Sequence, residues 1–180
     1  MEFGLIPALE GDVVQVMVES PRGSMLKLKY EEAWQVMSIS RPLPAGVIYP
    51  YDWGFIPSTT APDGDPLDAM VIWDVASFPG VVLRCRAIAV IYVEQNKMNF
   101  DPSVRVHNDR VLLVPLEARR EAAMTDLASI SQRMRAELEH FAGAATALEG
   151  KDIRITGWGG AVEALELVRR SAGESQSKAD

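Results

Sequence analysis

The segment Asp63-Gly-Asp-Pro-Leu-Asp68 runs directly into the apolar sequence Ala69-Met-Val-Ile-Trp73, so three carboxylates stand at the entrance of a predicted strand. Carboxylates this close together repel one another, and a fold that keeps them side by side normally supplies a cation. Their oxygens are hard ligands, which favour Mg²⁺, Mn²⁺ or Ca²⁺ over zinc. The segment therefore predicts a divalent-cation site, although an acidic turn without any ligand has a similar composition.

The composition is typical of one compact domain that does not bind nucleic acids. The chain has 180 residues, of which 48% are hydrophobic, enough for a substantial core but not for two domains of typical size. Its formal net charge of −7 argues against DNA or RNA as a partner, since a phosphate backbone requires a basic face. The single cysteine, Cys85, cannot form an internal disulfide. We expect a cytoplasmic protein without membrane contact, because the sequence has neither a long apolar span nor a signal pattern.

Apolar and β-branched runs predict that the first two thirds of the chain are rich in strands. Strands are expected at residues 13–18, 26–30, 34–39, 69–73, 81–93 and 104–115. The first of them would deliver Glu19 to its end. Between residues 42 and 66, repeated proline and glycine exclude a helix and allow only short strands. Together these strands suggest a closed or nearly closed barrel.

The hydrophobic period changes from that of a strand to that of a helix after residue 124. Apolar residues then recur at spacings of three and four, at Leu127, Ile130, Met134, Leu138 and Phe141. This pattern predicts a helix that Thr125 or Asp126 caps and that ends before Gly150. A short strand at residues 152–156 and a second helix at residues 161–170 would follow. Strands first and helices last predict an α+β fold.

A longer series of motifs resembles the family I soluble inorganic pyrophosphatases. The similarity begins with Glu19, Pro21 and Lys27. It continues through the run Arg41-Pro-Leu-Pro-Ala-Gly-Val-Ile-Tyr-Pro-Tyr-Asp-Trp-Gly-Phe-Ile-Pro57 and the acidic segment Asp63–Asp68. Near the C-terminus it includes the motifs Glu139-His-Phe, Leu148-Glu-Gly-Lys151 and Gly157-Trp158. The resemblance implies a five-stranded OB-like β-barrel with additional strands and two C-terminal flanking helices. It also implies a single domain at residues 1–172, and the polar residues 173–180 are expected to form a flexible tail.

The resemblance implies hydrolysis of inorganic diphosphate to two orthophosphates by a water that is activated at the aspartate triad. The cofactor would be Mg²⁺, with Mn²⁺ as an alternative, and the protein would be a homo-oligomer, usually a hexamer in bacteria. The residues expected to hold metal are Asp63, Asp65, Asp68, Glu19 and Asn108. Asp65, as the base, and Tyr49 would be catalytic. The residues expected to bind substrate are Lys27, Lys29, Arg41, Tyr49, Trp53 and Arg110.

The chain departs from the family pattern in the second half of the expected metal site. The family's second pair of aspartates corresponds here to Gln95 and Asn108. Asn108 still offers a carbonyl oxygen, but without a negative charge it should hold a divalent cation less tightly. Neighbouring carboxylates that could compensate are Glu94, Asp101 and Asp109. On strict strand alternation Asp109 points away from Asn108, so it compensates only if the chain is locally irregular.

Further departures concern the phosphate contacts. Counting back from Arg41 favours Lys27 as the family's lysine and leaves Lys29 in place of an acid, whereas a strand bulge would allow the other register. Trp53 replaces a tyrosine, Arg110 replaces a lysine, and Ala145-Thr146 replaces a Tyr-Lys pair. Two alternatives to diphosphate hydrolysis therefore stay open. One is a non-catalytic member that binds diphosphate or a nucleotide, and the other is a hydrolase for a larger diphosphate ester.

Overall fold

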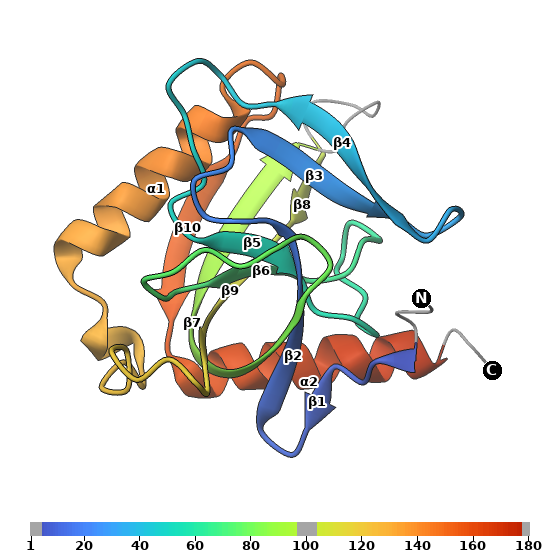
Figure 1. Cartoon of the computed structure of the whole chain (residues 1–180), viewed down its shortest axis with the longest axis vertical. Helices are drawn as coiled ribbons and strands as arrows, with labels where there is room; N and C mark the ends of the chain where they lie inside the picture. Colours follow the sequence, from blue (N-terminus) through green and yellow to red (C-terminus); the bar gives the residue numbers. More distant parts are fainter. Residues whose placement is uncertain (1–4, 97–103, 178–180) are drawn as a thin grey trace.

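The computed structural model describes residues 5–96 and 104–177, and its strands form two sheets (Figure 1). The larger sheet contains β1 (Leu9–Glu10), β2 (Val13–Ser20), β5 (Asp52–Phe55), β6 (Asp68–Val71), β7 (Val82–Asn96), β8 (Arg105–His107), β9 (Arg110–Pro115) and β10 (Arg154–Gly159). The smaller sheet is the hairpin of β3 (Leu26–Glu31) and β4 (Val36–Pro42). A 3₁₀ turn, η2 (Leu127–Ser129), and the helices α1 (Gln132–Thr146) and α2 (Ala161–Ser177) complete the fold.

Strand pairing within the larger sheet closes a barrel. The strands follow the order β2–β5–β6–β9–β7, and a further pairing of β7 with β2 completes the ring. The pairing of β6 with β9 is parallel, and the other pairings of the ring are antiparallel. The α+β fold with a five-stranded barrel and two C-terminal helices, predicted from the sequence, is confirmed. A barrel leaves none of its strands with an unpaired edge, which removes the usual risk of edge-to-edge aggregation.

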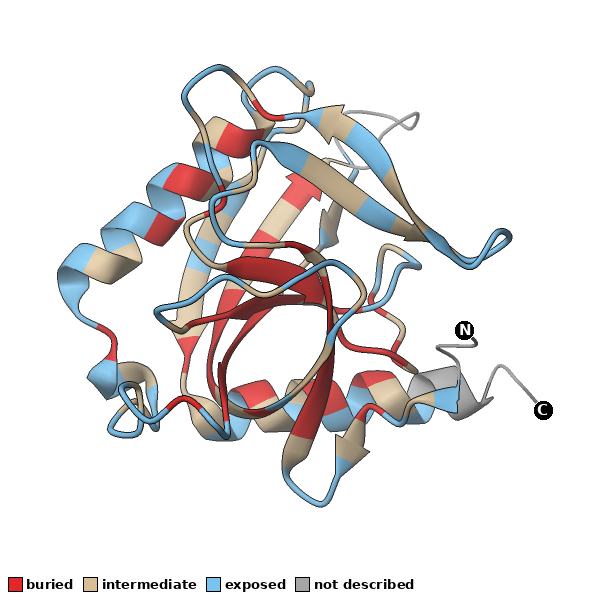
Figure 2. Cartoon of the chain, in the orientation of Figure 1, coloured by how far each residue is buried: buried red, intermediate tan, exposed pale blue. Residues whose placement is uncertain are grey.

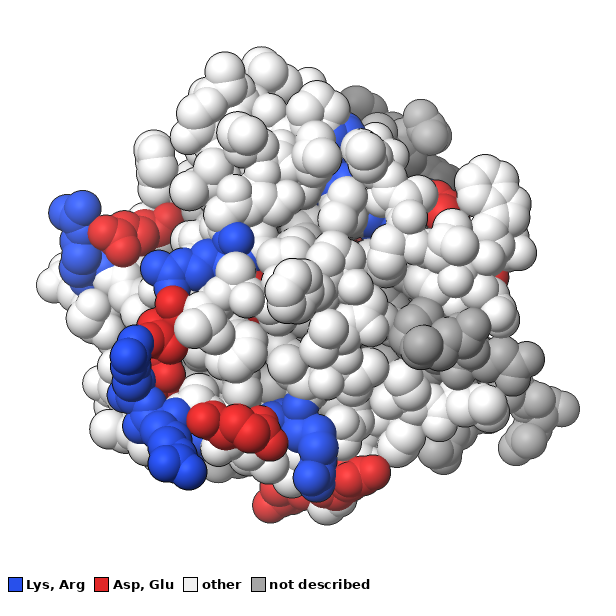
Figure 3. Space-filling view, viewed as in Figure 1, with Lys and Arg blue, Asp and Glu red and all other residues white. Residues whose placement is uncertain are grey.

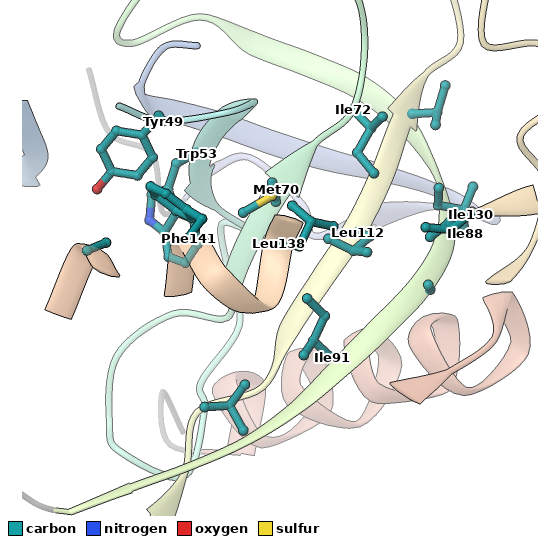
Figure 4. Packing of buried hydrophobic residues seen from close by; sticks show 14 of the residues in the cluster. Tyr49, Trp53, Met70, Ile72, Ile88, Ile91, Leu112, Ile130, Leu138 and Phe141 are labelled. Carbon is teal, nitrogen blue, oxygen red and sulfur yellow. The ribbon is translucent and has the colours of Figure 1, made fainter. Parts of the chain in front are cut away.

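The barrel strands are buried on both faces (Figure 2). Along β6, Met70 belongs to a cluster that includes Leu138 and Phe141 of α1, while Ala69 and Val71 belong to a cluster that includes residues of α2. Figure 4 shows the first cluster, in which apolar side chains of the strands face α1. Burial on both faces explains why β6 and β9 are continuous apolar runs after their first residues.

Several predicted boundaries are wrong in detail. The long helix begins at Gln132, where the Ser131 hydroxyl accepts the N–H of Met134 at 3.1 Å, and it does not begin near residue 125. Asp126 instead caps η2, and Ile130 is extended and separates η2 from α1. Asp126 and Ser131 are equally suitable N-caps, so residue type alone does not show where the helix begins. The apolar residues keep a helical spacing across the extended Ile130, and the sequence pattern therefore does not reveal the break between η2 and α1.

Two more elements differ from the prediction. The strand expected at residues 104–115 is divided into β8 and β9 at Asn108 and Asp109. The helix expected to end at residue 170 continues as α2 to Ser177. The division of the chain into a domain and a tail after residue 172 stays a prediction.

Gly54 allows β2 and β5 to approach closely. A Cβ atom at this position would lie 1.8 Å from the carbonyl oxygen of Met17, so we expect Gly54→Ala to force the two strands apart. The free energy of unfolding should fall by at least about 2 kcal/mol, measured by urea denaturation. Gly143→Ala is the matched control, because a Cβ atom there meets open space on α1. It should be neutral or stabilise the protein by up to about 1 kcal/mol. Equal stability of the two variants would contradict the close approach.

Candidate active site

A cavity of about 220 Å³ lies where the barrel, the β3–β4 hairpin and the end of α1 meet. Its charged lining residues are Lys27, Arg41, Asp68, Arg110, Glu149 and Lys151. They come from β3, β4, β6, β9 and the loop between α1 and β10, so only the folded chain brings them together. Four of the six are basic although the whole chain is acidic, and this local excess of positive charge favours an anionic ligand.

The parallel pairing of β6 and β9 places Asp68 directly opposite Arg110. Arg110 is buried, its guanidinium lies 5.5 Å from the ring centre of Trp53, and Nη1 donates to the carbonyl of Asn108 at 3.1 Å. Burial lowers the pKa of Arg110, and the charge of Asp68 opposes this shift. Burial also raises the pKa of Asp68, while Arg110 and Lys27 oppose the increase. Each charge therefore stabilises the other in the lining of the cavity.

The remaining predicted metal-binding carboxylates lie outside the cavity lining, beside Asp68. Burial raises the pKa of Glu19 to about 7, and the negative charge of Asp68 contributes to the increase. The backbone N–H of Tyr30 donates to Oε1 of Glu19 at 2.9 Å, and this hydrogen bond opposes the increase. Asp63 and Asp65 occupy an exposed turn, in which Gly64 adopts a positive φ of 97°. Burial also raises the pKa of Asp63, and the charge of Asp65 contributes. The carboxylates are thus close enough to repel one another.

The structure does not bring the aspartate triad into a ready-made metal site. In residues 5–96 and 104–177, no group of three His, Cys, Asp or Glu side chains is placed so that it could hold a metal ion. The donors nevertheless fit a hard divalent cation in kind, because they are carboxylates that raise one another's pKa. Their side chains would have to converge when the ion binds.

The β3–β4 hairpin decides which lysine faces the cavity. Lys27 pairs with Arg41, and the next pair is Leu28 with Ile39, so Ser40 is an extra residue in a bulge of β4. Lys27 and Arg41 both line the cavity. Lys29 is exposed, and its ammonium contacts Glu31 at 2.7 Å. The register favoured from the sequence agrees with this arrangement, whereas Lys29, predicted as a substrate-binding residue, lies outside the lining.

Tyr49 and Trp53 form an aromatic wall of the cavity with Phe141 (Figure 4). The ring centre of Tyr49 lies 6.0 Å from the ring centre of Trp53 and 5.2 Å from the ring centre of Phe141. Burial raises the pKa of Tyr49 to about 12, and a hydrogen bond with Ser20 opposes the shift. The phenol is therefore protonated at neutral pH and can donate a hydrogen bond, but it cannot act as a base there.

Gln95 and Asn108 both line the cavity in the place predicted for the second carboxylate pair. Of the three neighbouring acids, the two that the structure describes do not take over that place. The carboxylate of Asp109 accepts the N–H of Val93 at 2.9 Å outside the lining, and Glu94 pairs with Arg105 at 3.4 Å. Asp101 lies outside the described residues. This wall of the cavity is therefore formed by neutral amides.

Sequence reasoning assigned no role to Glu149 and Lys151, although both line the cavity. Glu149 Oε2 lies 3.2 Å from Nε of Arg41, and Nη2 of Arg41 donates to the carbonyl of Ala145 at 2.8 Å. Burial lowers the pKa of Lys151, and the charge of Lys27 contributes to the decrease. The signal that could have identified them was the motif Leu148-Glu-Gly-Lys151, which belongs to the family resemblance.

Charges of both signs are distributed over the face that Figure 3 shows. Lys and Arg side chains there are interleaved with Asp and Glu, mainly on the side where α1 lies, and this face has no broad basic patch. The basic residues that converge do so inside the cavity. A small cavity that is lined mainly by basic side chains, with carboxylates beside it, favours a small anionic ligand such as a phosphate compound.

The chain belongs to the inorganic pyrophosphatase family, whose model matches residues 16–176. The inorganic pyrophosphatase of Thermus thermophilus is 35% identical over 161 residues, which cover 88% of this chain and 87% of that protein. That of Streptomyces coelicolor is 34% identical over 157 residues, covering 87% and 91%. The resemblance inferred from the sequence and the predicted class of enzyme, a diphosphate hydrolase, are therefore confirmed.

Solved structures agree with this assignment. The crystal structure of the inorganic pyrophosphatase from Thermus thermophilus matches with a TM-score of 0.89 at 31% identity and covers 98% of this chain and 99% of that chain. The structure of the inorganic pyrophosphatase from Coxiella burnetii matches with a TM-score of 0.84 at 30% identity, covering 94% and 99%. The similarity extends over nearly the whole barrel and both helices.

The contact between Glu149 and Arg41 generates a prediction. A bound phosphate anion has to compete with Glu149 for Arg41, so Glu149→Gln should lower the KM for diphosphate. A partly exposed ion pair contributes on the order of 0.5–1 kcal/mol, which corresponds to about a two- to fivefold change. Steady-state phosphate release measures the effect. Glu137→Gln, which removes an exposed pair with Arg133 on α1, should leave the KM unchanged. A higher KM in Glu149→Gln would show that Glu149 assists binding.

Proposed function

We propose that this chain hydrolyses inorganic diphosphate to two orthophosphates in the described cavity, and that its aspartate triad holds Mg²⁺. The observation that carries the proposal is the convergence of four basic side chains beside Asp68 in a barrel of the inorganic pyrophosphatase family. Diphosphate carries several negative charges near neutral pH, so the cationic lining matches it in sign. The cavity is also below the roughly 300–1,000 Å³ of pockets for drug-sized ligands, which suits a small substrate.

The basic residues would bind the phosphate groups in different ways. Arg41 presents a planar fork for bidentate contact with phosphate oxygens, whereas Lys27 supplies a compact charge. Arg110 is buried under Trp53 and would act mainly by holding Asp68 charged and oriented. Tyr49 would donate a hydrogen bond from its protonated phenol. Lys29 would contribute only a distant charge, because its ammonium is engaged by Glu31.

The carboxylates would provide the cation site and the base. When bound, Mg²⁺, or Mn²⁺ in its place, would neutralise the diphosphate and lower the pKa of a water molecule. Asp63, Asp65 and Asp68 would hold the ion directly, and Glu19 would contact it from the outer side. Asp65 would accept the proton of the attacking water at a carboxylate oxygen. Asn108 would offer only a neutral oxygen, so the triad would carry most of the binding.

The cellular context of the protein follows from family resemblance. We propose that it is a cytoplasmic homo-oligomer, a hexamer if it resembles the bacterial members of the family. Within residues 5–96 and 104–177, none of the helices is long and apolar enough to cross a membrane.

The role of Asp68 can be tested by its amide variant. Asp68→Asn keeps the side-chain shape but removes the charge that faces Arg110. We expect kcat/KM for diphosphate with Mg²⁺ to fall at least about a hundredfold, because even residues that only support a metal ligand contribute about 10–100-fold. Asp12→Asn, an exposed carboxylate that pairs with Arg169, should leave turnover unchanged. Turnover at the native level in folded Asp68→Asn, verified by circular dichroism, would place the site elsewhere.

Metal binding can be measured without substrate. Titration of Mg²⁺ by calorimetry should show binding to the native chain, and Asp65→Asn should weaken it at least about tenfold because a negative hard ligand is lost. Asp12→Asn again serves as the control, with unchanged affinity expected. If the native chain binds diphosphate but neither binds Mg²⁺ nor releases phosphate, it is the non-catalytic member that the sequence left open.

A further inference from the structure

The acids in the lining of the cavity are matched by arginines, and its lysines are not. Among the described residues, the acids of the lining are Asp68 and Glu149. Asp68 lies opposite Arg110 across the parallel strands. Oε2 of Glu149 lies 3.2 Å from Nε of Arg41. Because each acid has an arginine beside it, the charges of the two lysines in the lining stay uncompensated.

These two lysines, Lys27 and Lys151, are free to meet a ligand. Within residues 5–96 and 104–177, neither side chain forms an ion pair or a hydrogen bond. Both residues are half-buried in the lining, where charges are screened less than on the open surface. Burial and the charge of Lys27 lower the pKa of Lys151, and the charge of Asp68 opposes the decrease. The two ammonium groups therefore repel each other, and an anion between them would remove this repulsion.

The expected ligands of the divalent cation do not share the lining with the lysines, except for Asp68. Asp63, Asp65 and Glu19 lie outside the lining. Lys27, from β3, and Lys151, from the loop between α1 and β10, lie within it. An anion can therefore contact both ammonium groups without a cation between it and the carboxylates of the exposed turn.

We propose that Lys151 is a substrate-binding residue that holds diphosphate together with Lys27, and that this pair binds the anion without a divalent cation. The proposal rests on the proposed function, because it concerns the same cavity and the same anion. Diphosphate carries several negative charges, so each ammonium can donate to its oxygens at the same time. Binding of the anion is then a step that does not require Mg²⁺, whereas hydrolysis does.

Calorimetry with methylenediphosphonate in the presence of EDTA tests the cation-free step, since its P–C–P bridge resists hydrolysis. The native chain should bind it with a dissociation constant below about 1 mM, as two charge-assisted hydrogen bonds allow. If the chain hydrolyses diphosphate with Mg²⁺ but does not bind methylenediphosphonate in EDTA, this inference is overturned and the proposed function stands. Binding in EDTA without any hydrolysis in Mg²⁺ would support the inference and remove the proposed function.

Lys151→Met removes the ammonium and keeps most of the side-chain volume. It should weaken binding of methylenediphosphonate in EDTA about ten- to a hundredfold, the effect of one charge-assisted hydrogen bond. Arg154→Met is the matched control, because it removes a positive charge from an exposed side chain nearby in the sequence. It should change the affinity by less than about twofold. Equal losses in the two variants would show an effect of net charge alone and would overturn the assignment.

The variants also report on folding and on the second lysine. Because Lys151 has no ion-pair partner among the described residues, we expect no fall in the melting temperature of Lys151→Met. Lys151→Arg keeps the charge and should bind at least about fivefold more tightly than Lys151→Met. Lys27→Met should weaken binding in EDTA by a factor similar to that of Lys151→Met. Affinity at the native level in either methionine variant would contradict a site that uses both lysines.

Steady-state kinetics with Mg²⁺ distinguishes binding of the substrate from action on the reacting atoms. A contact made equally in the ground state and the transition state affects KM and leaves kcat unchanged. We therefore expect Lys151→Met to raise the KM for diphosphate by a larger factor than it lowers kcat. A fall in kcat at an unchanged KM would place Lys151 in the chemical step and would overturn its assignment to substrate binding.

Discussion

The parallel pairing of β6 with β9 is the constraint on which the site depends. Parallel strands need a long crossover, and here that crossover contains β7, which itself pairs with β2 and closes the barrel. Because the two parallel strands start at the same rim, their first residues, Asp68 and Arg110, face each other there. The pairing of β6 with β9 is thus one of the pairings that form the barrel, and it also sets the charge pair of Asp68 and Arg110 in the cavity.

The site is built around charges that are incompletely satisfied within the chain. Lys27, Arg41, Arg110 and Lys151 approach from separate segments, and burial makes their mutual repulsion stronger than it would be in water. The carboxylates beside them also raise one another's pKa. A polyanion and a divalent cation would relieve both kinds of repulsion at once. The mutual repulsion within each set of charges would therefore favour binding of a polyanion and a divalent cation.

The neutral wall distinguishes this chain from the pattern that its sequence resembles. Gln95 and Asn108 stand in the lining where carboxylates were expected, and Asp109 and Glu94 are engaged elsewhere. Two of the possible compensations weighed from the sequence are thereby removed. Asp109 does not join the cavity because the strand is divided at Asn108 and Asp109, and the carboxylate of Asp109 accepts a hydrogen bond from the backbone of β7. Such an irregularity is set by strand pairing and is invisible in the hydrophobic pattern.

The sequence by itself determined the strand-rich barrel, the two helices and the acidic segment, because apolar periodicity and turn residues act locally. Its resemblance to the pyrophosphatase family also pointed to Arg41, Tyr49 and Asp68, all of which line the cavity. It could not place the start of α1, since Asp126 and Ser131 are equally good caps and only packing chooses between them. The sequence favoured Lys27 over Lys29 but left both registers open, and the tertiary structure decided between them. Tertiary structure alone decided that Glu149 and Lys151 join the cavity. The position of Lys27 depends on a bulge in the β3–β4 hairpin, and those of Glu149 and Lys151 depend on contacts between segments that are distant in the sequence.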